Sequence, residues 1–301
     1  MLSFASGGVI TKTVEDPSLF FEETNFVSNF IRKMLILPLF NLLPKGTGTY
    51  LFIKTSTSAS EIYNFAKSSR ALEILYNFDG KFEKAGKFLD VVFTYFWQRH
   101  FINAKAVRNR FKLVQKELYR CATEISTQEP VRILSLASGS ARVVITILAQ
   151  LKKAGLKAEA KLLDLNPSAL VISKKIAAEF GVSNMIIEYC EDKVGNFEKY
   201  INGWRPNIIE MVGFMDYLSQ SKGILITKKI YNVLPDSGYF ITCNIKDNDE
   251  RKFLTKVLNW DMNYRDPDEL STILVEGGFD PDYCQILYEP YKIHGIAIGK
   301  K

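Results

Sequence analysis

Hydrophobic and polar positions follow two different patterns along the chain, and the change falls near Pro130. Over residues 60–125 apolar side chains recur at helical spacing, as from Val107 to Phe111, and helix-breaking residues are few. The part of the chain before this stretch is harder to assign. We therefore expect residues 1–125 to form a mostly α-helical N-terminal domain.

Beyond Pro130 short β-branched and leucine-rich runs alternate with amphipathic helical segments. This alternation is typical of a parallel sheet that is covered by helices on both faces. We expect residues 126–301 to form an α/β domain with a Rossmann-like, doubly wound and mainly parallel sheet. The expected strands are Val131–Leu136, Ala160–Leu165, Met185–Cys190, Asn207–Val212 and Tyr239–Ile245.

Two helices of this domain have clear start signals. Asn166 directly before Pro167 is typical of an N-cap followed by proline in the first helical position. Asp266 before Pro267, with Glu269 behind them, predicts a capping box. Both signals support an alternating order of strands and helices.

The end of the domain departs from that order. Residues 282–289 and 292–300 have the composition of strands, and only Pro290 and Tyr291 separate them. This connection is too short for a parallel crossover, so we expect an antiparallel hairpin. An ordinary dinucleotide-binding fold would continue with further parallel units instead.

The net charge of +6 is unevenly distributed: residues 1–130 carry 17 basic and 12 acidic residues, which is +5 and leaves +1 for the rest. Arg108, Lys112, Lys116 and Arg120 recur every four residues and form a basic stripe on a helix. We expect this stripe to be a solvated face, because nucleic-acid binders usually combine a stronger basic bias with aromatic residues. A nucleic-acid partner is therefore disfavoured.

Other features limit the cellular setting. The four cysteines are far apart, no CxxC pair occurs, and two histidines are too few to suggest a metal site. We expect reduced thiols and, because no export signal is recognised, a cytoplasmic protein. Met34–Leu43 is apolar but too short to span a bilayer. We expect Phe26–Leu43 to pack within its own domain; peripheral membrane contact or an apolar substrate entrance are the alternatives.

Candidate ligand-binding residues follow the first three expected strands. Residues 136–142 (LASGSAR) contain small side chains, but the single Gly139 does not make the GxGxxG dinucleotide motif. Asp164 comes 25 residues after Gly139 and could accept hydrogen bonds from two ribose hydroxyls. Its alternative role, capping the next helix, already belongs to the asparagine that follows. Asp192, or else Glu191, could accept a hydrogen bond from an adenine amino group.

These positions and the terminal hairpin resemble class I S-adenosylmethionine-dependent methyltransferases over residues 131–301. The loop after the first strand departs from that family, because Ala137 and Ser140 replace glycines that many members carry. The resemblance implies S-adenosyl-L-methionine as cofactor and S-adenosyl-L-homocysteine as product. It assigns cofactor contacts to Ala137, Ser138, Gly139, Ser140, Asp164, Leu165, Asn166, Asp192, Val212 and Gly213.

A narrower resemblance covers Asn103–Val114, Asp216–Leu218 and Trp260–Arg265. These segments are similar to bacterial methyltransferases with a helical N-terminal region, including a group associated with methyl esters of hydroxy fatty acids. The resemblance implies that Arg108, or Arg110, approaches the methionine carboxylate of the cofactor, since a guanidinium suits bidentate recognition. The alternative is the solvent-facing stripe described above.

Acceptor contacts are expected after the fourth strand and near the last helix. Asp216 or Tyr217 could orient or deprotonate an acceptor, although Tyr217 is equally compatible with the core. Tyr264 and Arg265 could bind the carboxylate of a substrate; alternatively Arg265 pairs with the acids that follow it. No [DN]PPY motif follows the fourth strand, which disfavours amide and adenine amino acceptors. His294 lies inside an expected strand and is interpreted as structural.

The sequence as a whole predicts a methyltransferase that acts on a small molecule, such as the carboxylate or hydroxyl of a lipid-like metabolite. The helical domain would be a cap that selects the acceptor. One alternative is an inactive S-adenosylmethionine-binding or scaffolding protein, which the altered loop favours. A nucleic-acid methyltransferase is the weaker alternative. A homodimer remains open, and a nicotinamide dehydrogenase is disfavoured by the missing glycines and the hairpin.

Overall fold

The computed structural model describes residues 2–66, 68–78, 88–125 and 129–301. Its internal contacts divide the chain into two compact units. We call them the sheet unit, made of residues 1–15, 110–246 and 263–301, and the helical unit, made of residues 16–109 and 247–262. Neither unit is a single stretch of chain.

The sheet unit is built on one mixed sheet, in which the described residues form nine strands in the order β1-β2-β8-β9-β7-β6-β3-β4-β5. Neighbours from β7 through β6, β3 and β4 to β5 are parallel, whereas β9 is antiparallel to both β7 and β8. The strands are β1 (Leu2–Phe4), β2 (Ile10–Thr13), β3 (Val131–Leu136), β4 (Ala158–Asp164), β5 (Ile186–Glu191), β6 (Ile208–Met211), β7 (Tyr239–Ile245), β8 (Cys284–Tyr288) and β9 (His294–Lys300).

The expected Rossmann-like sheet and its terminal hairpin are confirmed. Strands β3 and β7 have the expected bounds, and the other parallel strands differ by one or two residues at their ends. The hairpin does not simply extend the sheet, because β9 inserts between β7 and β8. All seven residues of β7 pair with β9, and all of them are buried. Burial on both sides explains why this strand has no polar alternation.

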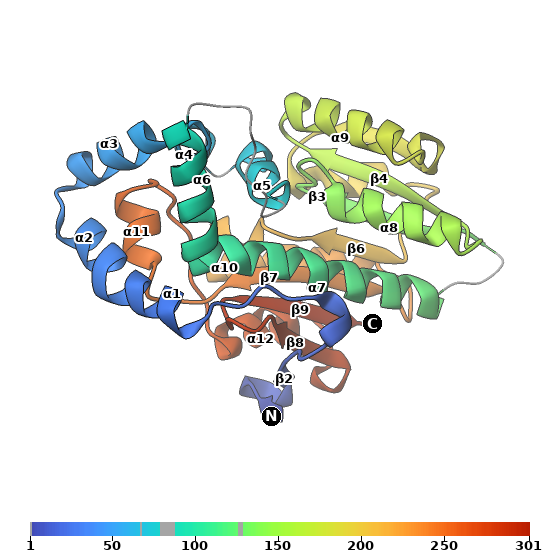
Figure 1. The fold of residues 1–301 in the computed structure, drawn as a ribbon. Helices are drawn as coiled ribbons and strands as arrows, with labels where there is room; N and C mark the ends of the chain where they lie inside the picture. The colour runs from blue at the N-terminus through green and yellow to red at the C-terminus, as the bar shows by residue number, and fades with distance from the viewer. Residues whose placement is uncertain (1, 67, 79–87, 126–128) are drawn as a thin grey trace. The chain divides into compact units, whose positions relative to one another are not determined.

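The N-terminal strands were not expected from the sequence. In Figure 1 the blue strand β2 lies beside the red strand β8, and the two pair in parallel from Ile10 with Gln285 to Thr13 with Tyr288. Strand β1 pairs antiparallel with β2 at the edge of the sheet. The first 15 residues therefore belong to the sheet unit, in contrast to the expected helical domain of residues 1–125.

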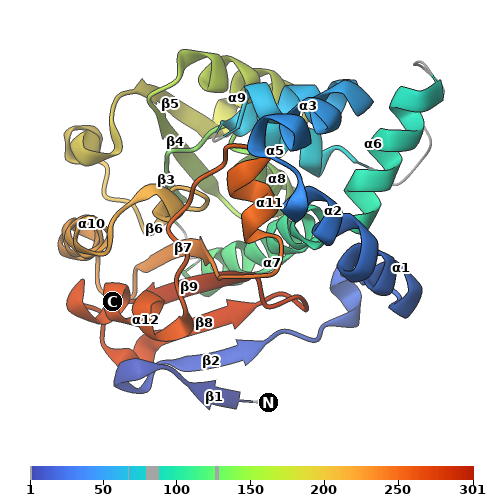
Figure 2. The ribbon, with the colours of Figure 1, turned by 90° about the vertical axis from the view of Figure 1, so that its left-hand side faces the viewer.

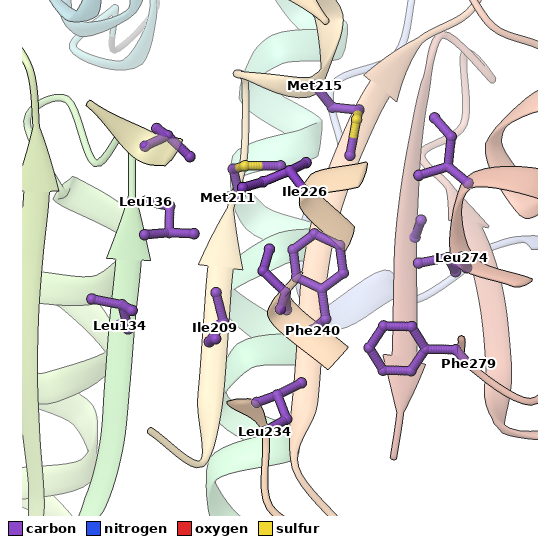
Figure 3. Close-up of a cluster of buried hydrophobic side chains, with 14 of the residues drawn as sticks. Leu134, Leu136, Ile209, Met211, Met215, Ile226, Leu234, Phe240, Leu274 and Phe279 are labelled. Atoms are coloured by element: carbon purple, nitrogen blue, oxygen red, sulfur yellow. The ribbon is translucent and has the colours of Figure 1, made fainter. Parts of the chain in front are cut away.

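Helices cover both faces of the sheet, as Figure 2 shows, with α10 and α12 on one face and α7 and α8 on the other. Figure 3 shows part of the core that the sheet forms with α10 and α12; it extends from Leu134 through Ile209 to Phe240, whose ring stacks on that of Phe279 at a centroid distance of 6.2 Å. The helices are α7 (Ile102–Ile125, of which residues 110–125 lie in this unit), α8 (Arg142–Lys153), α9 (Pro167–Glu179), α10 (Gln220–Val233) and α12 (Pro267–Glu276).

The expected helix starts are confirmed in detail. Asn166 precedes Pro167, and its side chain accepts a hydrogen bond from the N–H of Ser168. Asp266 and Glu269 form the reciprocal hydrogen bonds of a capping box at the start of α12. Each cap uses a backbone N–H that has no partner within its helix, so local sequence was sufficient to locate these starts.

The helical unit encloses an aromatic core. The rings of Phe101 and Phe253 stack at a centroid distance of 4.3 Å, and Phe52 packs edge-on against Phe253 and Trp97. Its helices are α1 (Phe26–Ile31), the π-helical turn η3 (Arg32–Ile36), α2 (Leu37–Leu42), α3 (Lys45–Thr55), α4 (Thr57–Asn64), α5 (Ser69–Tyr76), α6 (Phe88–His100), the first residues of α7, and α11 (Arg251–Lys256).

A buried ionic cluster joins the two chain segments of the helical unit. Arg32 donates two hydrogen bonds to Asp249 and one to Glu250, and Glu250 also accepts from the backbone N–H of Ile102 and Asn103. Because Glu250 is fully buried, these donors offset the cost of removing its charge from water. The segment 247–262 is thereby fixed to residues far away in the sequence.

Candidate functional site

The loop after β3 contains three left-handed residues in a row of small side chains. Ala137, Gly139 and Ala141 have φ angles of 50°, 56° and 52°. The N–H of Ser138 donates to the carbonyl of Leu163 at 3.0 Å, which anchors the loop to β4. Ala137 therefore keeps a backbone conformation that glycine adopts without strain. The substitution of glycine by alanine in this loop changes the side chain but preserves the turn.

Asp164 is the last residue of β4, and its carboxylate contacts the loop after β3. Its Oδ2 accepts from the N–H of Gly139 and its Oδ1 from the N–H of Asn166, both at 2.8 Å. A carboxylate has about four acceptor positions, so each oxygen retains the capacity for one further donor. Leu165 beside it is 62% exposed. The helix that follows is capped by Asn166, and the carboxylate of Asp164 is directed to the loop instead.

Asp192 follows β5 at the same edge, and its backbone N–H donates to the carbonyl of Asp164 at 3.3 Å. Its carboxylate already accepts from the Asn196 amide at 2.6 Å, the Lys193 N–H, Lys199 and the Tyr200 hydroxyl. The Asn196 amide and the Lys193 N–H lower the pKa of Asp192 to about 2. The carboxylate thus organises its own loop, and a ligand would compete with these donors.

The end of β6 adds an open turn to this edge. Gly213 has a φ of 87°, and no atom lies within 4 Å of the position that a Cβ would occupy there. Val212 precedes it and donates its N–H to Glu210 at 2.8 Å. The hydroxyl of Ser138 is buried and has no hydrogen-bond partner among the described residues. A polar ligand that lies along the loop after β3 would supply the missing partner. These observations fit a nucleoside-type cofactor.

Glu210 is a buried acid that sequence reasoning missed. It lies in β6, accepts from the Ser135 hydroxyl at 2.5 Å, and is 6% exposed. Burial raises the pKa of Glu210 to about 7, against the opposing effects of Ser135, the Val212 N–H and the charge of Arg110. The available signal was a glutamate within the apolar run of the expected strand Asn207–Val212.

Arg110 is the cation of this region. It belongs to the sheet unit, is 3% exposed, and donates to the Sγ of Cys243 at 3.8 Å. Its charge lowers the pKa of Glu210 and of Asp216, opposing the larger effect of burial on each carboxyl. Arg110 therefore balances buried negative charge below the carboxyl edge of the sheet.

Arg108 has different partners, which lie within the helical unit. Its guanidinium pairs with both oxygens of Glu22, donates to the side chain and carbonyl of Gln98, and lies over the ring of Phe78. With 5% exposure and these partners, it does not support the expected contact with a cofactor carboxylate. A bidentate carboxylate from the chain itself occupies the geometry that the cofactor would need.

The basic stripe is also not a solvated face. Of its four members Arg108 is buried, Lys116 and Arg120 are half-buried, and Arg120 pairs with Glu117 at 2.8 Å and with Glu124. Lys112 is only partly exposed. The expectation of a solvent-facing stripe was wrong, because α7 is enclosed along much of its length and its charges serve internal pairs.

Asp216 lies in the short turn after β6 and is 3% exposed. Its Oδ1 accepts from the N–H of Ile245 at 2.7 Å, and its carbonyl accepts from the N–H of Asn263. Burial raises the pKa of this carboxyl. The contacts tie the turn to the end of β7, so the expected direct contact with an acceptor is not supported for Asp216. Tyr217, half-buried beside it, remains a candidate.

Arg265 supports the same turn from the other side. Its guanidinium donates to the Met215 carbonyl at 3.0 Å, the Leu218 carbonyl, Gln220 and Asn244, and it is 4% exposed. A substrate carboxylate would have to displace these acceptors, so the expected binding role is replaced by one in loop positioning. Tyr264 is half-buried directly before it.

Two further observations concern His294 and metal-binding side chains. His294 is buried, neither ring nitrogen has a hydrogen-bond partner among the described residues, and burial lowers the pKa of the imidazole well below its usual value. The described residues also contain no cluster of three or more histidine, cysteine or acidic side chains suited to a metal ion.

Comparisons with known proteins identify the fold. No protein-family model and no curated protein matches the chain. Among solved structures, a possible exported protein from Bordetella parapertussis is similar with a TM-score of 0.65, 14% identity, and coverage of 83% of this chain and 84% of that one.

Two further structures belong to methyltransferases. The S-adenosylmethionine-dependent methyltransferase SibL gives a TM-score of 0.50 at 14% identity, covering 91% of this chain and 76% of its own. Magnesium protoporphyrin IX methyltransferase from Synechocystis, solved with S-adenosylhomocysteine, gives 0.51 at 10% identity, covering 67% of this chain and 87% of its own. The chain has the class I methyltransferase fold.

Proposed function

We propose that the chain binds S-adenosyl-L-methionine at the carboxyl edge of β3, β4, β5 and β6 and transfers its methyl group to a small molecule. The observation that carries the proposal is the carboxylate of Asp164, held 2.8 Å from the N–H of Gly139 at the end of β4. This pairing places an acceptor for ribose hydroxyls beside a turn of small residues that a ligand can approach closely. The neighbouring methyltransferase structures support the same cofactor.

Each side chain has a stated task in this proposal. Asp164 accepts hydrogen bonds from the two ribose hydroxyls with its remaining acceptor positions. The hydroxyl of Ser138, which has no hydrogen-bond partner among the described residues, forms a hydrogen bond with the cofactor. Leu165 packs its exposed side chain against the base. Asp192 shapes the loop at the adenine end, and Gly213 leaves room beside the reacting group. Ala137 and Ser140 complete the loop after β3.

The reaction needs little acid–base chemistry from the protein. When bound, S-adenosylmethionine would supply an electrophilic methyl carbon on a sulfonium. The acceptor bonds to this carbon, and the sulfur leaves as a neutral thioether. The residues of the chain then align the acceptor and exclude water. Asp216 and Arg265 position the turn after β6 through hydrogen bonds to the backbone. We assign contact with the acceptor to the side chains of Tyr217 and Tyr264.

We assign acceptor selection to the helical unit and propose a hydrophobic acceptor that carries a carboxylate or hydroxyl. The aromatic composition of this unit supports an apolar substrate class, and the missing [DN]PPY motif disfavours amino acceptors. We place the reaction in the cytoplasm, since the four cysteines are unpaired and buried as thiols would be in a reducing compartment.

Calorimetric titration with S-adenosylmethionine and S-adenosylhomocysteine tests the cofactor assignment. Asp164→Ala removes two charge-assisted hydrogen bonds and is expected to weaken binding by roughly 10- to 100-fold. Asp282→Ala, at an exposed acid of the same unit, is the matched control and should leave the affinity unchanged. Absence of binding to the wild type, or equal binding by Asp164→Ala with its circular dichroism intact, contradicts the proposal.

A transfer assay with labelled methyl groups separates the remaining alternatives. Incorporation into a long-chain carboxylic or hydroxy acid, measured beside amine acceptors, is the expected result. Cofactor binding without transfer to any member of the panel would favour a binding or scaffolding protein. Salt-sensitive binding and methylation of RNA or DNA would favour a nucleic-acid enzyme, which the internal pairing of the α7 cations disfavours.

A further inference from the structure

The N-terminal arm of the helical unit, formed by α1, η3 and α2, is anchored within that unit by the side chains of Ser28, Asn29 and Arg32. Arg32 and Asn29 of this arm bind each other and Arg32 binds Asp249, while the Ser28 hydroxyl contacts the Nδ1 of His100 at 2.7 Å. Arg32 is 2% exposed. The inward side of the arm is thus anchored by hydrogen bonds and an ion pair, which is the reverse of an ordinary surface helix.

The outward side of the arm is apolar. We call this set of residues the apolar face; each of its members is between 55% and 84% exposed. The π-helical turn inserts an extra residue between α1 and α2, and this keeps residues from both helices on the outward side. The apolar face consists of Phe26, Val27, Phe30, Met34, Leu35, Leu39 and Leu42. The expectation that Phe26–Leu43 packs within its own domain holds in part, because Ile36 and Leu37 are buried and the ring of Phe40 lies 5.1 Å from that of Phe253.

The charged residues of the chain segment that carries the apolar face are all basic, and Asp249, the acid that approaches them, is already bound by Arg32. No aspartate or glutamate occurs from Phe26 to Ser60, whereas the same stretch contains one arginine and three lysines. Lys33 is 56% exposed beside the apolar face, with its Nζ 3.9 Å from Asp249, and Lys54 is exposed on α3. Two copies of such a face would bring their lysines together, while the carboxylate of Asp249 is already taken by Arg32, which disfavours self-association.

We propose that the apolar face docks on an anionic lipid bilayer, with its side chains in the boundary between headgroups and acyl chains. Exposed phenylalanine and leucine side chains on a short helix, flanked by lysines, match the chemistry of that boundary. No helix of the described residues is long and apolar enough to cross a membrane, so the contact is with the surface. Docking would bring the protein to an apolar substrate, but it does not depend on methyl transfer.

Sedimentation of the full chain with vesicles tests the proposal directly. We expect binding to phosphatidylcholine vesicles that contain about 30% phosphatidylglycerol, weakened by salt and at least about tenfold weaker on phosphatidylcholine alone. The double substitution Phe30→Ser with Leu35→Ser should reduce binding at least about tenfold, because it removes two inserted side chains. Val171→Ser with Leu225→Ser, at exposed apolar residues of α9 and α10, is the matched control and should bind as the wild type does.

A fluorescent probe reports insertion independently of sedimentation. All four native cysteines are buried, so Leu39→Cys accepts an environment-sensitive dye at one site. We expect a blue shift and increased emission with the anionic vesicles, and no change for the same dye on Leu225→Cys. Loss of binding in Phe30→Ser with Leu35→Ser, together with unchanged cofactor titration and circular dichroism, supports docking separately from the enzymatic proposal.

Three outcomes would overturn docking on lipid. The wild type could bind anionic vesicles no better than phosphatidylcholine vesicles, or the double variant could bind as tightly as the wild type. Light scattering could also reveal a concentration-dependent dimer that the double variant abolishes while vesicles are not bound. The last result would assign the apolar face to a second copy of the chain.

Discussion

Glu210 is the residue whose environment makes the clearest prediction about stability. Its pKa is raised from 4.5 to about 7 by burial, so the folded protein holds a proton that the unfolded chain releases between these values. The contribution of this group to stability is therefore most favourable below about pH 4.5 and is lost as the pH rises toward 7. The raised pKa corresponds to about 3 kcal/mol across that window.

Glu210→Gln should remove this pH dependence, because its amide oxygen can accept from the Val212 N–H while its NH2 group donates to the Ser135 hydroxyl. Relative to the wild type, the free energy of unfolding of the variant should rise by about 3 kcal/mol between pH 4.5 and 7.5. Urea unfolding at several pH values measures the difference. A constant difference between the two proteins over this range would show that Glu210 titrates normally.

Residue-scale prediction from sequence succeeded where the role is local. Asp164 was identified by its spacing from Gly139 and its place after a strand, and the structure joins these two residues. Arg108 and Arg265 were assigned to ligands but serve the protein, because their partners depend on tertiary placement. Glu22 lies 86 residues before Arg108, and no spacing rule connects the two. An arginine shows its charge in the sequence but does not reveal which carboxylate neutralises it.

At the scale of elements, helix caps and parallel strands were predictable, because they depend on residues that are close together in the sequence. The packing of α10 against α12 was not, although both helices were expected. Gly277 ends α12, and a Cβ there would lie 2.3 Å from the Cγ2 of Thr227 and 2.7 Å from the carbonyl oxygen of Ile273. Gly277 therefore lies both at the end of α12 and at a close contact with α10.

Gly277→Ala should test this contact. Because the Ile273 carbonyl is part of the helix and cannot rotate away, the added methyl should lower the free energy of unfolding by about 2 kcal/mol. The measurement is chemical denaturation. Gly195→Ala is the matched control, since nothing lies within 4 Å of its Cβ position, and its stability should change by less than about 0.5 kcal/mol. Equal stability of the two variants would mean that α10 and α12 can separate without cost.

For the whole molecule, the order of the strands in the sheet differs from their order along the chain. The class of fold followed from alternating elements, but β1 and β2 are short, lie beside Gly7 and Gly8, and join a strand near the other end of the chain. The helical unit likewise recruits residues 247–262 after most of the sheet is complete. Periodicity describes one segment at a time, and it contains no information on pairing across such separations.

The position of β2, between the edge strand β1 and β8, leads to a prediction that tests whether sheet stability and cofactor affinity are independent. Thr11 pairs with Ser3 in β1 and with Ile286 in β8, so Thr11→Pro removes a ladder donor and forces the strand apart. We expect the free energy of unfolding to fall by about 3 kcal/mol, whereas Thr11→Val, which keeps the backbone N–H, should change it by less than about 1 kcal/mol.

Three strands, β8, β9 and β7, stand between β2 and β6, which is the nearest strand of the candidate cofactor site. The affinity of Thr11→Pro for S-adenosylhomocysteine should therefore remain within about twofold of the wild type below its unfolding temperature, because distant sites are energetically independent. A matching loss of affinity and stability would show that the sheet responds as one cooperative body. Lost stability with retained affinity would show that the N-terminal strands protect the edge of β8 and leave the site to β3 and β4.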